Sequence, residues 1–178
     1  MNKKFWKNKK VFITGHNGFK GSWLSIWLTE LGAKVYGYSL NTNTEPSLFE
    51  TCFLDERVNS VTGDIRDYEK LKKTITSVEP DIVIHMAAQA LVLDSYENPI
   101  ETYQTNLMGT VNILNAIREL SSTKALINVT SDKCYENKEN FKAFKESDAM
   151  GGNDPYSSSK ACSELITAGY RTSFFKNS

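Results

Sequence analysis

The sequence predicts an α/β fold with one doubly wound parallel sheet and helices on both of its faces. Short apolar runs alternate along the chain with segments of helical period, which is typical of βαβ units. A glycine-rich turn directly follows the first apolar run. The 178 residues, 40% hydrophobic and 24% charged, are enough for one core of globular size, so we expect a single domain over residues 1–178.

The expected strands are short runs bounded by polar or glycine-containing turns. They lie at residues 11–14, 34–39, 57–62, 81–86 and 124–131. Five lysines fall among the first ten residues, and we interpret that segment as a solvated arm before the first strand. The polar segment 136–154 should form a loop beside the functional site, because long connections in compact domains are usually functional or mobile.

A helix is expected between the first two strands, where apolar residues recur at the i, i+3, i+4, i+7 spacing. The inward-facing residues should be Leu24, Trp27, Leu28 and Leu31. Gly32 follows at the position where a left-handed C-cap residue is expected.

A second helix should begin after Asp67 as its N-cap and end before Pro80. Its inward side chains should be Leu71, Ile75 and Val78. A third helix has Asn98 at the N-cap and Pro99 at its first position. Its apolar stripe is expected to run through Tyr103, Leu107, Val111, Leu114 and Ile117. The last helix should begin near Pro155.

The composition excludes several function classes. Twenty-one basic and twenty-one acidic residues cancel, so the chain lacks the positive field that attracts nucleic acid, and we expect a small-molecule partner. No apolar run is long enough for a signal peptide or a membrane span, and we expect no membrane association. Cys52, Cys134 and Cys162 lack a CxxC pattern, which favours free thiols in a reducing cytoplasm. Two isolated histidines predict no metal site.

The glycine turn carries the first functional signal. Residues 14–21 read TGHNGFKG between a strand and an amphipathic helix. Gly15, Gly18 and Gly21 would let the backbone turn tightly and approach a pyrophosphate, whose charge the helix N-terminus stabilises. Asn17 and Phe19 lie in the same turn. We therefore predict a Rossmann-like, dinucleotide-binding domain. Because such folds normally have about six strands, five strands indicate an N-terminal fragment whose C-terminal substrate lobe is missing.

The end of the second strand bears on the choice of cofactor. Ser39 stands there, and the acidic residue expected to bind the adenosine ribose is absent, which leaves NAD and NADP both open. No arginine lies near Ser39 to pair with a 2′-phosphate, which favours NAD. Asp64 and Ile65 could clamp the adenine, although Asp64 could equally be a helix cap. The fourth strand closes with His85, Ala87, Ala88 and Gln89. Small residues there would let the backbone approach the cofactor, or could simply form a tight turn.

A tyrosine and a lysine carry the second signal. Tyr156 and Lys160 are four residues apart and share one face of the last helix. An ammonium beside a phenol favours the phenolate, which is a base suited to an alcohol. Tyr68 and Lys72 repeat the spacing on what we interpret as an ordinary surface helix. Only the first pair follows a strand that ends near the expected position of the nicotinamide.

These motifs together resemble the extended short-chain dehydrogenase/reductase superfamily and, within it, the CDP-glucose 4,6-dehydratases. The resemblance spans essentially the whole chain and is carried by residues 15–24, 130–137 and 156–162. It implies a lyase that converts CDP-glucose to CDP-4-dehydro-6-deoxyglucose through bound NAD, in the biosynthesis of surface polysaccharides such as O-antigen. It also implies a homo-oligomer. If the chain is complete at 178 residues, we expect intact cofactor binding with weak or absent turnover.

The resemblance also implies a role for each site residue. Tyr156 takes the proton of the sugar 4-hydroxyl, Ser131 hydrogen-bonds the same oxygen, and Lys160 holds the nicotinamide ribose. Asp132 protonates the leaving C6 hydroxyl and Lys133 removes the C5 proton, although Lys133 could instead bind phosphate or polarise the ketone. A site residue is also implied on the third helix: Asn106.

Two other functions stay open. A nucleotide-sugar 4-epimerase would share the cofactor and the tyrosine, but it has no obvious use for Asp132 and Lys133. A noncatalytic NAD-binding module would share the glycine turn alone, because a fold does not fix a function.

Overall fold

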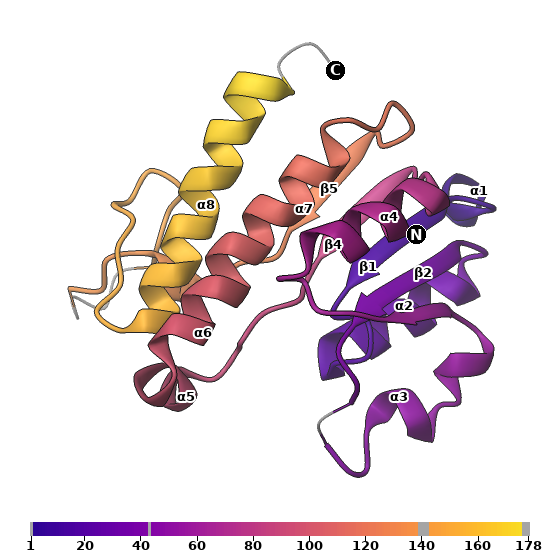
Figure 1. Cartoon of the computed structure of the whole chain (residues 1–178), viewed down its shortest axis with the longest axis horizontal. Helices are drawn as coiled ribbons and strands as arrows, with labels where there is room; N and C mark the ends of the chain where they lie inside the picture. Colours follow the sequence, from indigo (N-terminus) through magenta and orange to yellow (C-terminus); the bar gives the residue numbers. More distant parts are fainter. Residues whose placement is uncertain (1, 43, 139–142, 176–178) are drawn as a thin grey trace.

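The computed structural model describes residues 2–42, 44–138 and 143–175. Its five parallel strands form one sheet in the order β3-β2-β1-β4-β5 (Figure 1), which confirms the predicted doubly wound α/β fold. The strands are β1 (Lys10–Thr14), β2 (Lys34–Ser39), β3 (Asn59–Thr62), β4 (Ile82–His85) and β5 (Ala125–Asn128). Because Thr14 pairs in register with both Tyr38 and His85, the carboxyl ends of the three central strands meet at one edge.

Helices cover both faces of the sheet. The long ones are α2 (Phe19–Glu30), α4 (Tyr68–Val78), α7 (Gly109–Ile117) and α8 (Pro155–Phe174). The short elements are α1 (Lys3–Trp6), α3 (Leu48–Thr51), η1 (Leu54–Glu56), α5 (Val92–Glu97), α6 (Pro99–Tyr103), the π-helical η2 (Gln104–Met108) and the 3₁₀ turn η3 (Asp132–Cys134). On one face, α4 and α7 pack with α8 against Phe12 and Val83, and on the other α2 packs against Val11 and Ile13.

Two helix starts and two helix ends agree with the predictions. The Asp67 carboxylate accepts a hydrogen bond from the Lys70 amide, and α4 ends at Val78, two residues before Pro80. Pro155 is the first residue of α8. Gly32 has a φ of 87°, the left-handed conformation expected of the residue that ends α2. These boundaries depend on local chemistry, which is why the sequence predicts them.

The predicted inward face of α2 is wrong in part. Trp27 is 51% exposed and Leu24 is only half-buried, whereas Leu28 and Leu31 are buried. The buried face of the helix consists of Gly21, Ser22, Ser25 and Leu28. The glycine turn brings the start of α2 close to β1, and only small side chains fit between them. The large aromatic side chains therefore lie on the outer face.

The inward face of the third helical segment also differs from the prediction. Its expected stripe residues Tyr103, Leu107 and Val111 are only half-buried, whereas Asn106 and Thr110 are buried. These polar groups tolerate burial because α8 supplies their hydrogen-bond partners, Ser159 for Asn106 and Ser163 for Thr110. The segment is also interrupted by the π-helical turn η2, which no sequence pattern indicated.

The two ends of the predicted order need correction. The expected N-terminal arm instead forms α1, which the Asn2 side chain caps, and Trp6 packs against the sheet. The last strand ends at Asn128 instead of 131. The Val129 amide still bonds to β4, but its carbonyl accepts a hydrogen bond from the Lys160 ammonium, and the chain then leaves the sheet.

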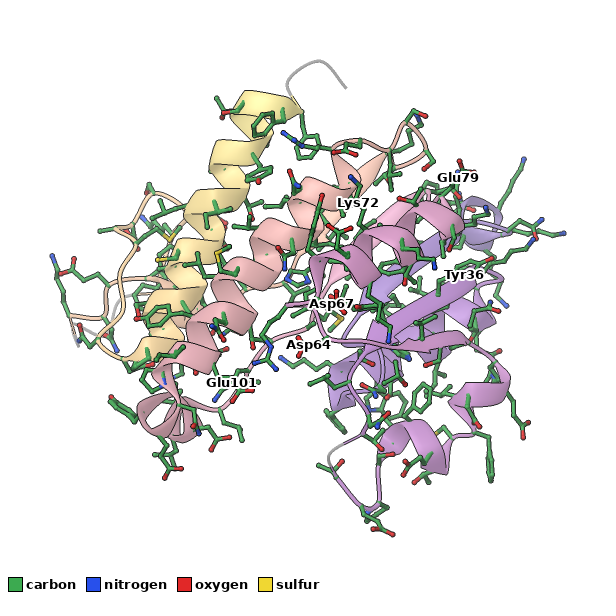
Figure 2. The ribbon with its side chains drawn as sticks, in the orientation of Figure 1. Tyr36, Asp64, Asp67, Lys72, Glu79 and Glu101 are labelled. Carbon is green, nitrogen blue, oxygen red and sulfur yellow. The ribbon has the colours of Figure 1, made fainter. Side chains whose placement is uncertain are left out.

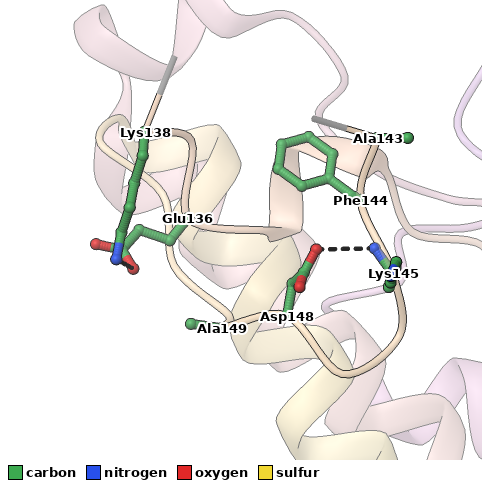
Figure 3. Close-up of a pocket in the computed structure, with 7 residues that line it drawn as sticks. All are labelled: Glu136, Lys138, Ala143, Phe144, Lys145, Asp148 and Ala149. Atoms are coloured by element: carbon green, nitrogen blue, oxygen red, sulfur yellow. Dashed lines mark hydrogen bonds and ion pairs between the residues drawn. The ribbon is translucent and has the colours of Figure 1, made fainter. Parts of the chain in front are cut away.

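The segment predicted as a loop, 136–154, includes residues 139–142, which lie outside the described residues. Its described part carries one antiparallel bridge, between Tyr135 and Met150, and no helix. It surrounds a small pocket of about 320 Å³ in which Glu136 pairs with Lys138 at 3.2 Å and the Asp148 carboxylate accepts from the Lys145 amide at 2.9 Å (Figure 3). None of the predicted site residues lies in this pocket.

Candidate functional site

A larger cleft, of about 680 Å³, runs along the carboxyl ends of the central strands. It extends from the turn after β1, past the ends of β2 and β4, to the first turns of α8. The predicted site residues that line it are Gly15, Asn17, Gly18, Phe19, Gly21, Ser39, Asp64, Ile65, Ala87, Ala88, Gln89, Tyr156 and Lys160. Asn106, Ser131, Asp132 and Lys133 are not among its lining residues. The cleft thus brings together residues that lie as much as 145 positions apart in the chain.

The glycine turn forms a backbone cradle at one end of the cleft. Gly15 has a φ of 72°, and a Cβ there would lie 2.8 Å from the Ala87 amide nitrogen. A Cβ on Gly21 would overlap the Gly15 carbonyl oxygen. Gly18 is the N-cap of α2, a helix of 12 residues whose positive end faces this turn. The turn therefore leaves room for an anionic group such as a pyrophosphate against the helix N-terminus.

Ser39 is held by a buried histidine. Its hydroxyl is 2.9 Å from Nδ1 of His16, whose Nε2 is 2.7 Å from the Ser60 hydroxyl. Burial lowers the pKa of His16 to about 4, so the ring is neutral near pH 7. Because both ring nitrogens are engaged by serines, His16 supports the end of β2 and supplies no charge to the cleft. The geometry therefore gives His16 a structural role.

Asp64 lies in an ion-pair network at the same end. Arg66 pairs with Asp64 at 2.6 Å and with Glu101 of α6 at 3.3 Å, and all three residues line the cleft. The guanidinium holds the pKa of the Asp64 carboxyl below its usual value. Figure 2 shows Asp64 and Glu101 near each other, on the sheet side and on the helix side of the cleft. Arg66 and Glu101 were not predicted, because only the neighbouring Asp64 and Ile65 point to Arg66 in the sequence and no local pattern points to Glu101.

Asn106 supports the wall of the cleft from behind. It is 2% exposed, and its side chain accepts from the Gln89 amide at 2.8 Å and donates to the Gln89 carbonyl at 3.0 Å. Its amide also donates to Ser159 of α8 at 2.9 Å. Asn106 therefore fixes the backbone at the end of β4 and joins it to α8. It does not line the cleft where a cofactor would lie.

Tyr156 and Lys160 form the other end of the cleft. Both project from the first turns of α8 and line the cleft. Lys160 is only 7% exposed, and its ammonium donates to the Val129 carbonyl at 3.3 Å. Burial lowers the pKa of Lys160 to about 8. The amine therefore remains mostly protonated at neutral pH, and it places a positive charge at this end of the cleft.

The three predicted catalytic residues after β5 lie on the turn that leaves the cleft. Ser131 caps the η3 turn, since its hydroxyl donates to Asp132 and accepts from the Lys133 amide, both at 3.2 Å. Asp132 and Lys133 are exposed. Thr130, which precedes them, lines the cleft. The cleft thus contains the phenol and the ammonium, and the acid–base candidates stand beside it in solvent.

Three other features concern the described ranges 2–42, 44–138 and 143–175: metal ligands, membrane spans and disulfides. There, no three His, Cys, Asp or Glu side chains are grouped so that they could hold a metal ion. None of the helices in these ranges has the length and apolar character needed to cross a membrane. Cys52, Cys134 and Cys162 are free thiols, as predicted.

Known proteins similar to this chain are nucleotide-sugar enzymes. Residues 12–175 match the family model described as GDP-mannose 4,6 dehydratase. A CDP-glucose 4,6-dehydratase of Salmonella typhimurium (strain LT2) is 55% identical over 175 residues, which cover 98% of this chain and 49% of that protein. A GDP-mannose 4,6-dehydratase of Vibrio cholerae serotype O1 is 32% identical over 180 residues, with coverage of 94% and 47%.

A solved structure of a nucleotide-sugar enzyme has a similar fold. The crystal structure of UDP-glucose 4-epimerase from Brucella ovis in complex with NAD has a TM-score of 0.80 and 27% identity, and the match covers 93% of this chain and 49% of that one. The chain therefore spans about half the length of the relatives that it matches.

Proposed function

The chain belongs to the GDP-mannose 4,6-dehydratase family, and we propose that it forms the NAD-binding part of an enzyme that converts CDP-glucose to CDP-4-dehydro-6-deoxyglucose. One observation carries the proposal: a single cleft joins the glycine cradle to Tyr156 and Lys160. The substrate is assigned from the Salmonella relative, whose name states CDP-glucose. Both the activity and the substrate belong to the whole protein.

The cradle fits NAD. The tight turn is possible because Gly15 and Gly21 lack a Cβ, which would collide with neighbouring backbone atoms. The N-terminus of α2 offers positive charge to a pyrophosphate. Ser39, Asp64 and Ile65 would hold the adenosine, with Ser39 accepting from a ribose hydroxyl. Two cations line this end of the cleft: Lys20 in the glycine turn, and Arg66, which is already paired with Asp64. No arginine lies near Ser39 in the sequence to pair with a 2′-phosphate, which favours NAD over NADP. When bound, NAD would supply the hydride acceptor for C4 of the sugar and the donor for C6.

Tyr156 would be the base that removes the proton of the sugar 4-hydroxyl. The Lys160 ammonium, on the same face of α8, would stabilise the negative charge that develops on the Tyr156 oxygen during this proton transfer. Lys160 would also donate a hydrogen bond to the nicotinamide ribose. Because Ala87 and Ala88 are small, the backbone at these residues could approach the ribose closely. Gln89 lines the same wall, and Asn106 holds it in place.

The later steps would use the turn after β5. Loss of water from C5 and C6 requires a base for the C5 proton and an acid for the C6 hydroxyl. Lys133 and Asp132 would take these roles, while Ser131 would bind the 4-oxygen after breaking its bond to Asp132. Because Lys133 is exposed, bound sugar would have to desolvate it before it could act as a base. If Lys133 instead binds phosphate or polarises the ketone, it needs only the charge of its ammonium group.

We also propose that the protein is a cytoplasmic homo-oligomer. Large apolar side chains stand exposed on α5, α6 and α8, among them Leu93, Ile100 and Leu165, and association would cover them. Sedimentation of the intact protein tests this proposal, and a strictly monomeric profile would contradict it.

Mass analysis of the product from CDP-glucose, without added reductant, tests the activity. We expect a sugar nucleotide lighter by one water molecule. A product of unchanged mass would instead support a 4-epimerase, a rival favoured by the likeness to the Brucella epimerase. Tight NAD binding without any product would support a noncatalytic binding module.

A further inference from the structure

Helix α8 binds three consecutive residues where the chain leaves β5. The Asn128 amide donates to Ser163 at 3.0 Å and to Thr167 at 2.8 Å. One residue later, the Val129 carbonyl accepts from Lys160 at 3.3 Å. We call this set of contacts, together with the one that follows at Thr130, the strand-exit clamp.

The third of these residues, Thr130, contacts Glu164. The Thr130 hydroxyl donates to a carboxylate oxygen of Glu164. Glu164 stands one helical turn after Lys160, on the same side of α8. It is half-buried, and Thr130 lines the cleft. The carboxylate is thus held between the catalytic helix and the segment that leads to Ser131.

Charged and titratable groups from two elements face this carboxylate. From α8 itself comes the buried ammonium of Lys160, whose pKa Glu164 raises against the effect of burial. From η3 and its C-cap come Cys134 and Tyr135. Burial is the largest cause that raises the pKa of each, and the charge of Glu164 raises both further. On the far side, His85 of β4 faces Lys160 and stays neutral because burial lowers its pKa to about 3.

The clamp has a geometric consequence for the site. Ser131 follows Thr130 directly, while Tyr156 and Glu164 share one rigid helix of 20 residues. A contact that fixes Thr130 on α8 therefore also fixes Ser131 relative to the phenol. Both groups would have to reach the same sugar oxygen, so a small displacement of either would lower the rate.

We propose that Glu164 is a positioning residue, which holds the segment of Thr130 and Ser131 on the catalytic helix and balances the buried charge of Lys160. Glu164 is not among the residues that line the cleft. Its kinetic consequence rests on the proposed function, but its structural consequence does not.

Two substitutions separate the two roles in the intact protein. Thr130→Val removes the donor and keeps the charge, so kcat should fall about 10-fold with an unchanged pH profile, and amide hydrogen exchange over residues 130–134 should become faster. Glu164→Gln keeps an acceptor oxygen and removes the charge, so exchange should stay unchanged. The alkaline limb of the kcat/KM profile should then move down by about one pH unit, because Lys160 loses its proton more easily.

Two further variants serve as controls. Glu119→Gln makes the same chemical change on an exposed glutamate that pairs with Lys72, and it should alter neither the pH profile nor the exchange. Thr130→Ser restores the hydroxyl and should recover most of the kcat and exchange protection lost in Thr130→Val, even if the valine variant is poorly folded.

The outcomes distinguish this proposal from the proposed function. Wild-type exchange over residues 130–134 in Thr130→Val would overturn the positioning role, and a wild-type pH profile in Glu164→Gln would overturn the charge role. If the wild-type protein makes no dehydrated product, the proposed function fails, while hydrogen exchange, measured without substrate or cofactor, still decides the positioning role.

Discussion

The two ends of the cleft are built in different ways. At the glycine turn, the backbone itself forms the site, and the requirement is that side chains be absent at Gly15 and Gly21. At the α8 end, side chains form the site, and hydrogen bonds hold them to segments about thirty residues away, as Lys160 is held to Val129. The first end is encoded locally. The second depends on the whole fold, and this difference determines how each end should respond to substitution.

Tyr156→Phe should have the largest effect and should separate the two ends. Loss of the phenol oxygen removes the proposed base, so turnover of CDP-glucose should fall by about 10³ or more. The cradle lies at the far end, so the Kd for NAD should change by less than about threefold. Steady-state kinetics and a fluorescence titration with NAD measure both values. Turnover near the wild-type rate would contradict the role of Tyr156.

Gly21→Ala should damage the cradle end. Its Cβ would overlap the Gly15 carbonyl, so the backbone must shift and NAD affinity should fall by about 10-fold or more, with a loss of about 2 kcal/mol in stability. Gly169→Ala is the matched control, because a Cβ on Gly169 of α8 meets nothing within 4 Å. The control should keep NAD affinity and raise the melting temperature slightly. Equal affinities for the two variants would refute the cradle.

The pH dependence of stability should report the buried support of the cradle. His16 has its pKa lowered to about 4 in the folded state, so between pH 6.5 and 4 the unfolded chain binds a proton that the folded chain does not. Stability should therefore fall as the pH falls through this range, by about 3 kcal/mol from this one group. Urea unfolding of the wild type and of His16→Gln tests this, since the variant should show a shallower slope. Identical slopes would contradict the assignment.

Asn106→Leu should have the smallest effect of the four. It leaves the Gln89 amide and carbonyl without their side-chain partner, which should cost about 2 kcal/mol of stability. Asn115→Leu removes only a half-buried contact with Tyr68 and should cost about 1 kcal/mol or less. Denaturant titration compares the two, and a larger loss for the Asn115 variant would contradict the role of Asn106.

Local signals made much of the fold predictable. Asp67 and Pro155 mark helix starts by their own chemistry, and the alternation of strands and helices predicts the parallel sheet. The inward face of α2 was not predictable, because it depends on the close approach of Gly21 to the glycine turn. Small side chains pack on that face, and Trp27 lies on the outer one. Asn106 was expected beside the cofactor, but its side chain is buried, where it forms hydrogen bonds with Gln89 and Ser159.

The candidate site divides in the same way. The glycine turn and the Tyr156–Lys160 spacing are sequence motifs, and both line the cleft. Arg66 with Glu101, and Thr130 with Glu164, are pairs separated by about 35 residues. No local pattern identifies such partners, because only the packed fold brings them together.

Deuterium transfer tests the central claim, that both ends of the cleft serve one reaction, most directly. CDP-glucose labelled with deuterium at C4 is converted, and the product is examined by NMR. We expect the deuterium to appear in the C6 methyl group of a 4-keto sugar, because one bound cofactor would carry it from C4 to C6. Deuterium that remains at C4 of an unoxidised sugar, or that is lost entirely to solvent, would show that the two ends of the cleft do not serve this reaction.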